Sequence, residues 1–323
     1  MKLNRLLSLM IIVLLCSTSV LVFAQDATPE ATEEALASCT ALHPCTTILS
    51  TDGGIAPQAA VYGDVGGVEL TLDVYEPPPS DSPRAAVILI HGGAGSFGDR
   101  SVEADRAEGL ATNGYVAFNI DYRLLDEGKN PWPAQIEDAQ LAVRWIRANA
   151  AKYNVDPARI CSLGHSFGGQ LAALLGERET PTGDKVPLAE YSSKVACVVD
   201  IAGSLDSLRP INDVTLQSVV TGLYGGTAYE VRDNYLSASA LAQVDANTAP
   251  FLIFHGADDE NISVEESRQM VDALHRAGVE VVYVEYPHAT HFYWISFFKI
   301  KGSWDTVAPE TLAFLGHHLK AVK

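Results

Sequence analysis

The chain has 323 residues, of which 47% are hydrophobic and 19% charged, and its formal net charge is −18. This composition supplies apolar material for a large core and excludes an intrinsically disordered chain. The acidic surface repels phosphate backbones, so nucleic acid is not expected as a partner.

The N-terminus predicts a secretory signal peptide over residues 1–24. Lys2 and Arg5 form a basic start, an apolar run follows from Leu6 to Val22, and Ala24 fits the small residue of a cleavage signal. An uncleaved membrane anchor is the alternative, but the apolar run is short for a bilayer. We therefore expect a secreted or periplasmic protein without stable membrane insertion after cleavage.

The cysteines lie in two different settings. Residues 25–51 are rich in Ala, Thr, Glu and Pro, which predicts a flexible linker, and Cys39 and Cys45 within it could form a disulfide in an oxidising compartment. Cys161 and Cys197 lie in apolar, strand-like runs, where we expect two buried free thiols. No Cys/His cluster has zinc spacing, so no metal is expected.

Residues 52–323 are predicted to form one domain, because strand-like runs recur along them. Continuous apolar runs are typical of strands that are buried on both faces of a parallel sheet. The runs are VELTLDVYEP (68–77), AAVILIHGG (85–93), YVAFNIDYR (115–123), RICSLGHS (159–166), KVACVVDIAGS (194–204), FLIFHGADD (251–259) and VEVVYVEYP (279–287).

Helical patterns lie between these runs. Apolar residues recur at steps of three and four over 132–153, and Ser263 and Gly278 are suitable caps for a helix between them. Other helices are expected from Gln170 and over 308–322. Alternation of strands and helices predicts an α/β fold with a mostly parallel central sheet and helices on both faces.

The segment 204–250 breaks the alternation of strands and helices. It is longer than an ordinary crossover and mixes short apolar pieces with Gly225-Gly226. Two interpretations remain open, a small cap over the sheet edge and a padded connection.

Ser166 lies in Gly164-His165-Ser166-Phe167-Gly168, a G-x-S-x-G motif between a predicted strand and a predicted helix. This context is typical of a nucleophile elbow, in which a tight turn presents the serine and the helix N-terminus favours negative charge. The alternative is a glycine-rich turn between strand and helix that has no catalytic role. The remaining parts of a serine hydrolase site must decide between the two.

A nucleophilic serine needs a base and a carboxylate that orients the base. His291 follows the last predicted strand, with His288 as a nearby competitor. Asp258 and Asp259 end a predicted buried strand, at the rim where catalytic groups collect. The chain order Ser166, Asp259, His291 is that of an α/β-hydrolase triad, with Asp258 as the alternative orienting acid.

The stretch His91-Gly92-Gly93-Ala94-Gly95 ends another predicted buried strand. Its glycines let backbone N–H groups turn toward a reacting carbonyl, and we expect the oxyanion donors to be Gly93, Ala94 and Phe167, the residue after the nucleophile. A plain glycine turn is the alternative. Together the features predict acyl transfer, in which the base takes the serine proton and later protonates the leaving alcohol.

The motifs HGGAGSFGDR, DYRL, GHSFGGQLAALLG, APFLIFHGADD and VVYVEYPHATHF occur in the order typical of bacterial α/β-hydrolase esterases. From about Val61 onward the chain resembles the carboxylesterase and feruloyl-esterase-like group that carries an HGG oxyanion loop. The resemblance implies an α/β-hydrolase fold with Ser166 as nucleophile, Asp259 as acid and the loop from Gly92 to Ala94 as oxyanion hole. It also favours His291 over His288 as the base.

Two departures from that family affect the pocket. Ala94 to Phe97 replace the further glycine or aromatic residue and the tryptophan that often follow HGG, and Thr290 stands where a glycine usually precedes the histidine. Substrate-binding candidates are Trp132, Phe292 and Trp294, whose aromatic rings could line an acyl or alcohol pocket or pack in the core.

The leading hypothesis is a secreted serine carboxylic-ester hydrolase with a Ser-His-Asp triad. Its partner would be a small-molecule or polysaccharide-linked ester, and no cofactor is implied because the triad and water suffice. A serine peptidase of the same fold and a noncatalytic binding protein are the alternatives. Acetyl-polysaccharide, feruloyl, short lipid, polyester and arylformamide substrates all remain open.

Overall fold

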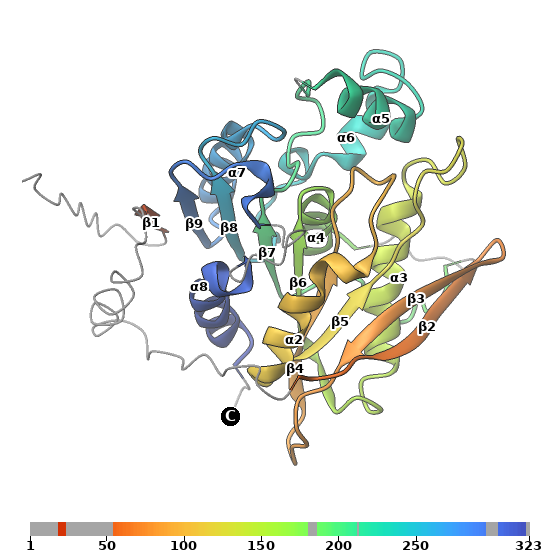
Figure 1. Cartoon of the computed structure of the whole chain (residues 1–323), viewed down its shortest axis with the longest axis vertical. Helices are drawn as coiled ribbons and strands as arrows, with labels where there is room; N and C mark the ends of the chain where they lie inside the picture. The colour runs from red at the N-terminus through yellow and green to blue at the C-terminus, as the bar shows by residue number, and fades with distance from the viewer. Residues whose placement is uncertain (1–18, 24–53, 180–185, 212, 295–302, 321–323) are drawn as a thin grey trace, which may run out of the picture.

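The computed structural model describes residues 19–23, 54–179, 186–211, 213–294 and 303–320 (Figure 1). Most of the predicted signal peptide and the whole of the predicted linker over residues 25–51, with Cys39 and Cys45, lie outside the described residues. Among the residues that are described, no helix combines the length and the apolar character that are needed to cross a bilayer.

The described strands form one nine-stranded sheet in the order β1-β9-β8-β7-β6-β4-β5-β3-β2. All neighbours pair in parallel except β2 with β3 and β3 with β5. The strands are β1 (Ser19–Phe23), β2 (Gln58–Val65), β3 (Val68–Tyr75), β4 (Arg84–Ile90), β5 (Val116–Ile120), β6 (Val155–His165), β7 (Cys197–Ile201), β8 (Phe251–Gly256) and β9 (Val281–Tyr286). The α/β-hydrolase fold and the mostly parallel sheet expected from the sequence are confirmed.

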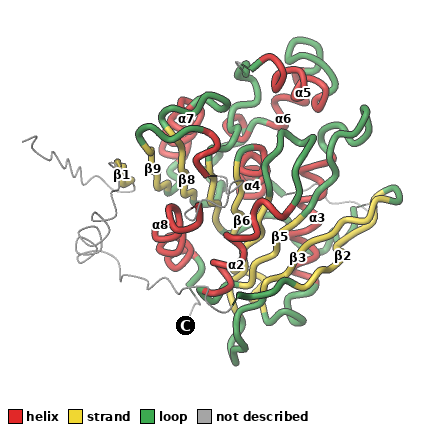
Figure 2. The backbone as a smooth tube through the Cα atoms, in the orientation of Figure 1, coloured by secondary structure: helices red, strands yellow, loops and turns green. Residues whose placement is uncertain are grey.

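Helices cover both faces of this sheet (Figures 1 and 2). The α-helices are α2 (Ala104–Thr112), α3 (Ala134–Ala148), α4 (Phe167–Glu177), α5 (Val214–Tyr224), α6 (Arg232–Ala238), α7 (Val264–Ala277) and α8 (Ser303–His318), and the short 3₁₀ helices are η1 (Arg100–Glu103), η2 (Ala240–Ala242) and η3 (His291–Trp294). The predicted caps of α7 are present, because Ser263 accepts a hydrogen bond from the Glu265 N–H and Gly278 adopts a left-handed conformation.

The central strands are apolar on both sides because each side faces its own core. In β4, Ile88 and Ile90 pack on one face with residues of α3, α4 and α7, whereas Val87 and Leu89 pack on the other face with α2 and α8. All four side chains are fully buried. This two-sided burial is the reason that the strand sequences are continuous apolar runs instead of alternating ones.

The N-terminal strand β1 falls within the predicted signal peptide. Ser19–Phe23 pairs in parallel with β9 at the edge of the sheet. Cleavage after residue 24 would remove this strand and leave β9 as the edge.

The segment 204–250 folds as a cap beyond the strand ends, where α5 and α6 lie at the top of Figure 1. Its first helix, α5, is capped at both ends. The Asp213 carboxylate accepts the Leu216 N–H at 2.8 Å, and Gly225 ends the helix in a left-handed conformation. Leu216, Gln217 and Val220 of α5 line a cavity that Ser166 also borders. Of the two interpretations of this segment, the structure favours a cap over a padded connection.

The expectation of free thiols at Cys161 and Cys197 is wrong in this structure, where the two residues form a disulfide. They are register partners on the adjacent parallel strands β6 and β7, with Cα atoms 4.7 Å apart. The sequence places each cysteine in a strand, but only the order of strands in the sheet makes the two direct neighbours.

Candidate active site

Ser166 occupies the sharp turn between β6 and α4. Its backbone angles are φ 57° and ψ −123°, and its N–H donates to the Ile201 carbonyl at 3.0 Å. A Cβ atom on Gly164 would collide with the Gly168 carbonyl, and one on Gly168 would collide with the Ile90 carbonyl. The G-x-S-x-G pattern therefore meets a steric requirement, because strand, turn and helix approach too closely for side chains at both glycines.

Ser166, His291 and Asp259 lie in a continuous hydrogen-bonded chain. The Ser166 Oγ is 2.9 Å from His291 Nε2, and His291 Nδ1 is 2.8 Å from Asp259 Oδ2. An ionised carboxylate can only accept, so Nδ1 carries the ring proton and Nε2 is left to accept the serine proton. The structure thus brings together the three residues that the sequence proposed as a triad.

Four donors surround the Asp259 carboxylate, whose side chain is fully buried. Oδ1 accepts the N–H groups of Asn261 at 2.9 Å and Ile262 at 2.8 Å. Oδ2 faces both His291 and His255. Burial raises the pKa of Asp259, but the hydrogen bonds and the charge interactions with the two rings together lower it by more, so the pKa lies well below its usual range and the group is ionised.

The alternative acid and base lie elsewhere. His288 Nδ1 is 3.2 Å from Asp258 Oδ2, and their side chains are 77% and 57% exposed. These two residues therefore pair with each other at the surface, and the structure does not bring them to Ser166.

The predicted oxyanion donors border the same cavity as Ser166. Gly93 (φ 116°) and Ala94 (φ 50°) both have positive φ, and the Gly93 carbonyl accepts the N–H groups of Ser96 and Phe97 in a tight turn. Within the described residues, the N–H groups of Gly93 and Ala94 have no hydrogen-bond acceptor. The Phe167 N–H, in the first turn of α4, has no intrahelical acceptor either, so three donors remain for a ligand.

The predicted oxyanion loop packs against a buried aromatic pair. The His91 ring stacks on Tyr122 with centroids 4.4 Å apart, and the Tyr122 hydroxyl donates to the His91 carbonyl at 2.9 Å. Burial lowers the pKa of His91. A neutral, stacked imidazole of this kind stabilises the loop and carries no charge to the site.

The cavity beside Ser166 has a volume of about 120 Å³ and a mainly apolar lining. Phe97 and Phe292 line it and are 59% and 57% exposed, so they form an apolar rim. Arg209 and Gln217, both from the cap segment, add polar groups to the wall. A site with these properties can bind a small, largely apolar group next to an activated hydroxyl.

The three predicted substrate-binding aromatics have different locations. Phe292 lines the cavity. Trp132 does not; its side chain is buried, its Nε1–H donates to Ser237 Oγ at 2.8 Å, and its ring packs edge-on against Tyr224, which does line the cavity. The structure thus places Trp132 behind the wall, in line with the packing alternative. Trp294 ends η3, but its side chain lies outside the described part of the structure.

Asp200 is a second buried carboxyl close to the elbow, on β7 beside Gly164. Among the described residues, neither of its oxygens has a hydrogen bond of good geometry, and the Gly203 N–H is a weak neighbour. Burial raises the pKa of Asp200 to about 8, and the nearby Gly203 N–H lowers it by a smaller amount. Unlike Asp259, this carboxyl has only one weak donor within the described part of the chain, the Gly203 N–H, which is too little to keep it ionised at neutral pH.

Sequence reasoning missed His255, which lies four residues before Asp259 and contacts it. The available signal was a polar residue inside the apolar run FLIFHG, since a histidine there must find partners when the strand is buried.

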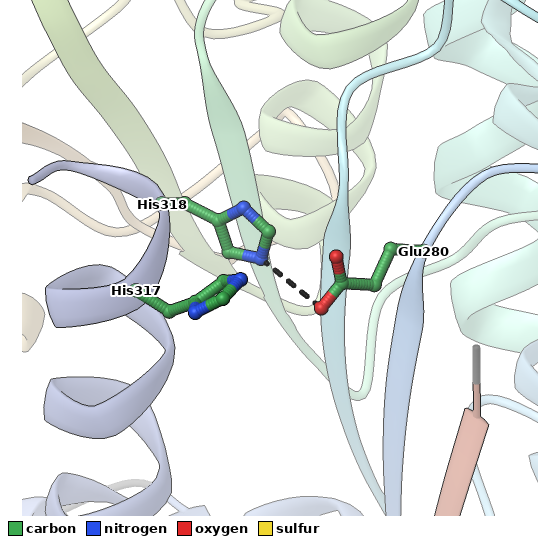
Figure 3. Close-up of side chains that lie close together, drawn as sticks. All are labelled: Glu280, His317 and His318. Carbon is green, nitrogen blue, oxygen red and sulfur yellow. Dashed lines mark ion pairs between the residues drawn. The ribbon is translucent and has the colours of Figure 1, made fainter. Parts of the chain in front are cut away.

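One group of side chains in the described residues could share a cation. Glu280, His317 and His318 have ligand atoms within 4.8 Å of one another, and His318 Nε2 lies 3.6 Å from Glu280 Oε1 (Figure 3). The group joins the end of α8 to the beginning of β9, at the opposite end of the sheet from Ser166. A cation held there would not reach an ester bound at Ser166.

Comparison with known proteins gives one family and several esterases. The model of the BD-FAE family matches residues 72–274, which is more than half of the chain. Esterase LipC of Mycobacterium tuberculosis (strain ATCC 25618 / H37Rv) is 32% identical over 238 residues, which are 72% of this chain and 58% of LipC. The probable carboxylic ester hydrolase LipM of the same strain is 29% identical over 71% of this chain and 54% of LipM. The chain therefore spans little more than half the length of these relatives.

Solved structures agree on the fold. The thermophilic esterase Est2 of the Planctomycetes species Thermogutta terrifontis has a TM-score of 0.69 at 24% identity, covering 81% of this chain and 92% of that one. The same esterase phosphorylated by paraoxon also has a TM-score of 0.69 and covers 82% of this chain and 96% of that one.

Proposed function

The chain belongs to the BD-FAE family, and from this premise and the geometry of the site we propose that it is a serine hydrolase of carboxylic esters. The observation that carries the proposal is the chain of contacts from Ser166 Oγ to His291 Nε2 at 2.9 Å and from His291 Nδ1 to Asp259 Oδ2 at 2.8 Å. LipC and LipM, which are named as ester hydrolases, support the same activity class.

The first half of the reaction acylates Ser166. His291 Nε2 takes the hydroxyl proton as Ser166 Oγ attacks the ester carbonyl, and Asp259 stabilises the imidazolium that forms. The tetrahedral oxyanion is stabilised by the N–H groups of Gly93, Ala94 and Phe167. The imidazolium then donates its proton to the leaving alcohol, and an acyl-enzyme remains.

The second half regenerates the enzyme. His291 removes a proton from water, the resulting nucleophile attacks the acyl carbon, and the acid leaves when His291 returns the proton to Ser166. Asp259 stays ionised through both halves, because its four donors oppose protonation.

The substrate class that we propose is a small-molecule or polysaccharide-linked ester. The mainly apolar cavity of about 120 Å³ suits a small acyl or alcohol group, and the exposed Phe97 and Phe292 suit an apolar portion that reaches beyond it. Trp294 is proposed as a further contact at this rim because it lies three residues after His291.

The experiment is hydrolysis of p-nitrophenyl acetate and butyrate by the full chain. We expect Ser166→Ala to lower kcat by about 10⁶-fold while the fold persists, and paraoxon to label wild type but not this variant. Ser82→Ala, an exposed serine in the loop before β4, is the control and should leave both readouts unchanged. Cleavage of peptide p-nitroanilides without ester cleavage would instead indicate a peptidase, and turnover of neither a binding protein.

We also propose that residues 1–24 are removed during export, which makes the mature protein secreted or periplasmic. The basic start and apolar run of this segment support the proposal. Mass spectrometry of the protein recovered outside the bacterial cytoplasm should give an N-terminus at Gln25. Recovery of exported protein that still begins at Met1 would contradict cleavage.

A further inference from the structure

His255 is a fully buried histidine at the end of β8 that takes no direct part in the proposed reaction. It precedes Gly256, where the strand ends, and the following loop returns Asp259 to its side. A polar ring without solvent contact must have its nitrogens satisfied by protein atoms.

Both ring nitrogens of His255 have suitable partners. Nε2 faces two acceptors, Asp259 Oδ2 at 3.3 Å and the Ile262 carbonyl at 3.1 Å. Nδ1 is 2.7 Å from the hydroxyl of Ser267, which is also fully buried on α7. Because neither acceptor at Nε2 can donate, Nε2 carries a proton in the arrangement that satisfies every group, and in the neutral ring Nδ1 accepts from Ser267.

The contact with Asp259 falls on the oxygen that orients the base. Oδ2 of Asp259 accepts from His291 and faces His255 on another side, whereas Oδ1 is held by the N–H groups of Asn261 and Ile262. Among the described residues, His255 is thus the side chain other than His291 that contacts Oδ2. We take this contact to fix the position of Oδ2.

The charged groups around the ring are few. Asp259 faces Nε2, and Glu285 is the register partner of His255 on β9. Glu285 is already engaged by Arg268, with Nη2 2.7 Å from Oε1, and by the Tyr283 hydroxyl at 2.7 Å from Oε2. Asp259 is therefore the carboxylate in contact with His255 Nε2, at 3.3 Å, beside the hydrogen bond from Nε2 to the Ile262 carbonyl.

We propose that His255 is a positioning residue: its ring is hydrogen-bonded through Nε2 to the Ile262 carbonyl and fixed by Ser267 at Nδ1, and its 3.3 Å contact with Oδ2 of Asp259 holds that oxygen at the place where it orients His291. The proposal rests on the proposed function for its assay, because the triad must act on an ester or an organophosphate. No proton has to leave His255 at any step. Its effect on Ser166 is transmitted through Asp259 and His291.

The main experiment compares His255→Leu with His255→Gln. Leucine removes the donor, whereas the glutamine amide can present an N–H near the Nε2 position. We expect His255→Leu to lower kcat for p-nitrophenyl acetate by about 10- to 100-fold with KM within about twofold, and His255→Gln to recover most of the loss. The matched control is His288→Gln in the exposed pair, which should keep wild-type kcat.

The pH profile separates positioning from a packing effect. When Oδ2 is no longer fixed, the His291 imidazolium loses part of its stabilisation, so the acid limb of kcat/KM should move down by about half a pH unit in His255→Leu. His165, whose Nε2 is 3.3 Å from the His291 carbonyl, also faces this base, but burial lowers its pKa well below the usual value and it stays neutral.

A second variant protects the proposal from a folding failure. Ser267→Ala should lower kcat by about threefold in the wild-type background, and should have no further effect in His255→Leu if it acts through the ring. Circular dichroism and urea unfolding establish that each variant is folded before its kinetics are compared.

The rate of labelling by paraoxon distinguishes this proposal from the proposed function. If wild type hydrolyses no ester but Ser166 is labelled, and His255→Leu slows labelling while His255→Gln does not, the function fails and the positioning role stands. A folded His255→Leu with wild-type kcat and labelling rate, or a folded His255→Gln no better than His255→Leu, would overturn the positioning role.

Discussion

Two aspartate–histidine pairs lie in the same two loops but in opposite environments. Asp259 and His291 are 2.8 Å apart with side chains that are 0% and 6% exposed, whereas Asp258 and His288 are 3.2 Å apart and 57% and 77% exposed. The residue types are identical, and the acids are adjacent in the chain. Burial and additional donors make the difference, because water screens the exposed pair and competes for its hydrogen bond.

The strongest test of this comparison replaces each histidine in turn with glutamine. His291→Gln should lower kcat for p-nitrophenyl acetate by about 10⁴- to 10⁶-fold, because Ser166 loses its base, whereas His288→Gln should change kcat by less than twofold. Steady-state kinetics on both folded variants gives the ratio. Equal losses would mean that His288 also contacts the reacting groups.

The acids provide the next largest effect. Asp259→Asn should lower kcat by about 10³- to 10⁴-fold, because an amide can leave His291 in the wrong tautomer and cannot stabilise its charged form. Asp258→Asn should stay within twofold of wild type. A large loss in Asp258→Asn would show that the exposed pair shares the work of the buried one.

A buried carboxyl with only one weak donor among the described residues sharpens the comparison further. Because burial raises the pKa of Asp200 to about 8, the folded protein keeps a proton that the unfolded chain releases above about pH 4. The stabilisation of the folded state by this proton is complete below about pH 4 and is lost as the pH rises to about 8. Over this range the unfolding free energy falls by up to about 1.4 kcal/mol per pH unit.

Asp200→Asn should therefore flatten the fall of the unfolding free energy between pH 5 and pH 8. Urea denaturation at several pH values measures both curves, and Asp258→Asn should keep the wild-type slope. Parallel curves for wild type and Asp200→Asn would contradict the raised pKa.

The smallest effect is expected from the exposed pair itself. A double-mutant cycle on Asp258 and His288 should give a coupling free energy of about 0.5 kcal/mol or less, which falls further in 1 M salt. Urea unfolding of the two single variants and the double variant measures it. A coupling above about 2 kcal/mol would place this pair in the same energetic class as the buried one.

Much of the fold was predictable because its signals are local. The apolar runs of β4 to β8 report burial on both faces, and Ser263 and Gly278 mark the ends of α7. By contrast, Trp132 carries no local sign of whether it packs or lines a cavity, since an aromatic ring between two prolines suits both. Its contact with Tyr224 depends on where the cap segment folds back.

The sequence by itself determined the elbow at Ser166, the glycine loop near Gly93 and the order of the candidate triad, because these depend on residue types at short spacings. Only the tertiary structure decided that Asp259 and His291 meet while Asp258 and His288 pair at the surface. It also decided the Cys161–Cys197 bond and the position of His255 against Asp259. The reason is that contacts between residues far apart in the chain depend on the order of the strands. Which of two adjacent residues in a loop faces the site depends on the path of that loop. No local sequence pattern encodes either of these.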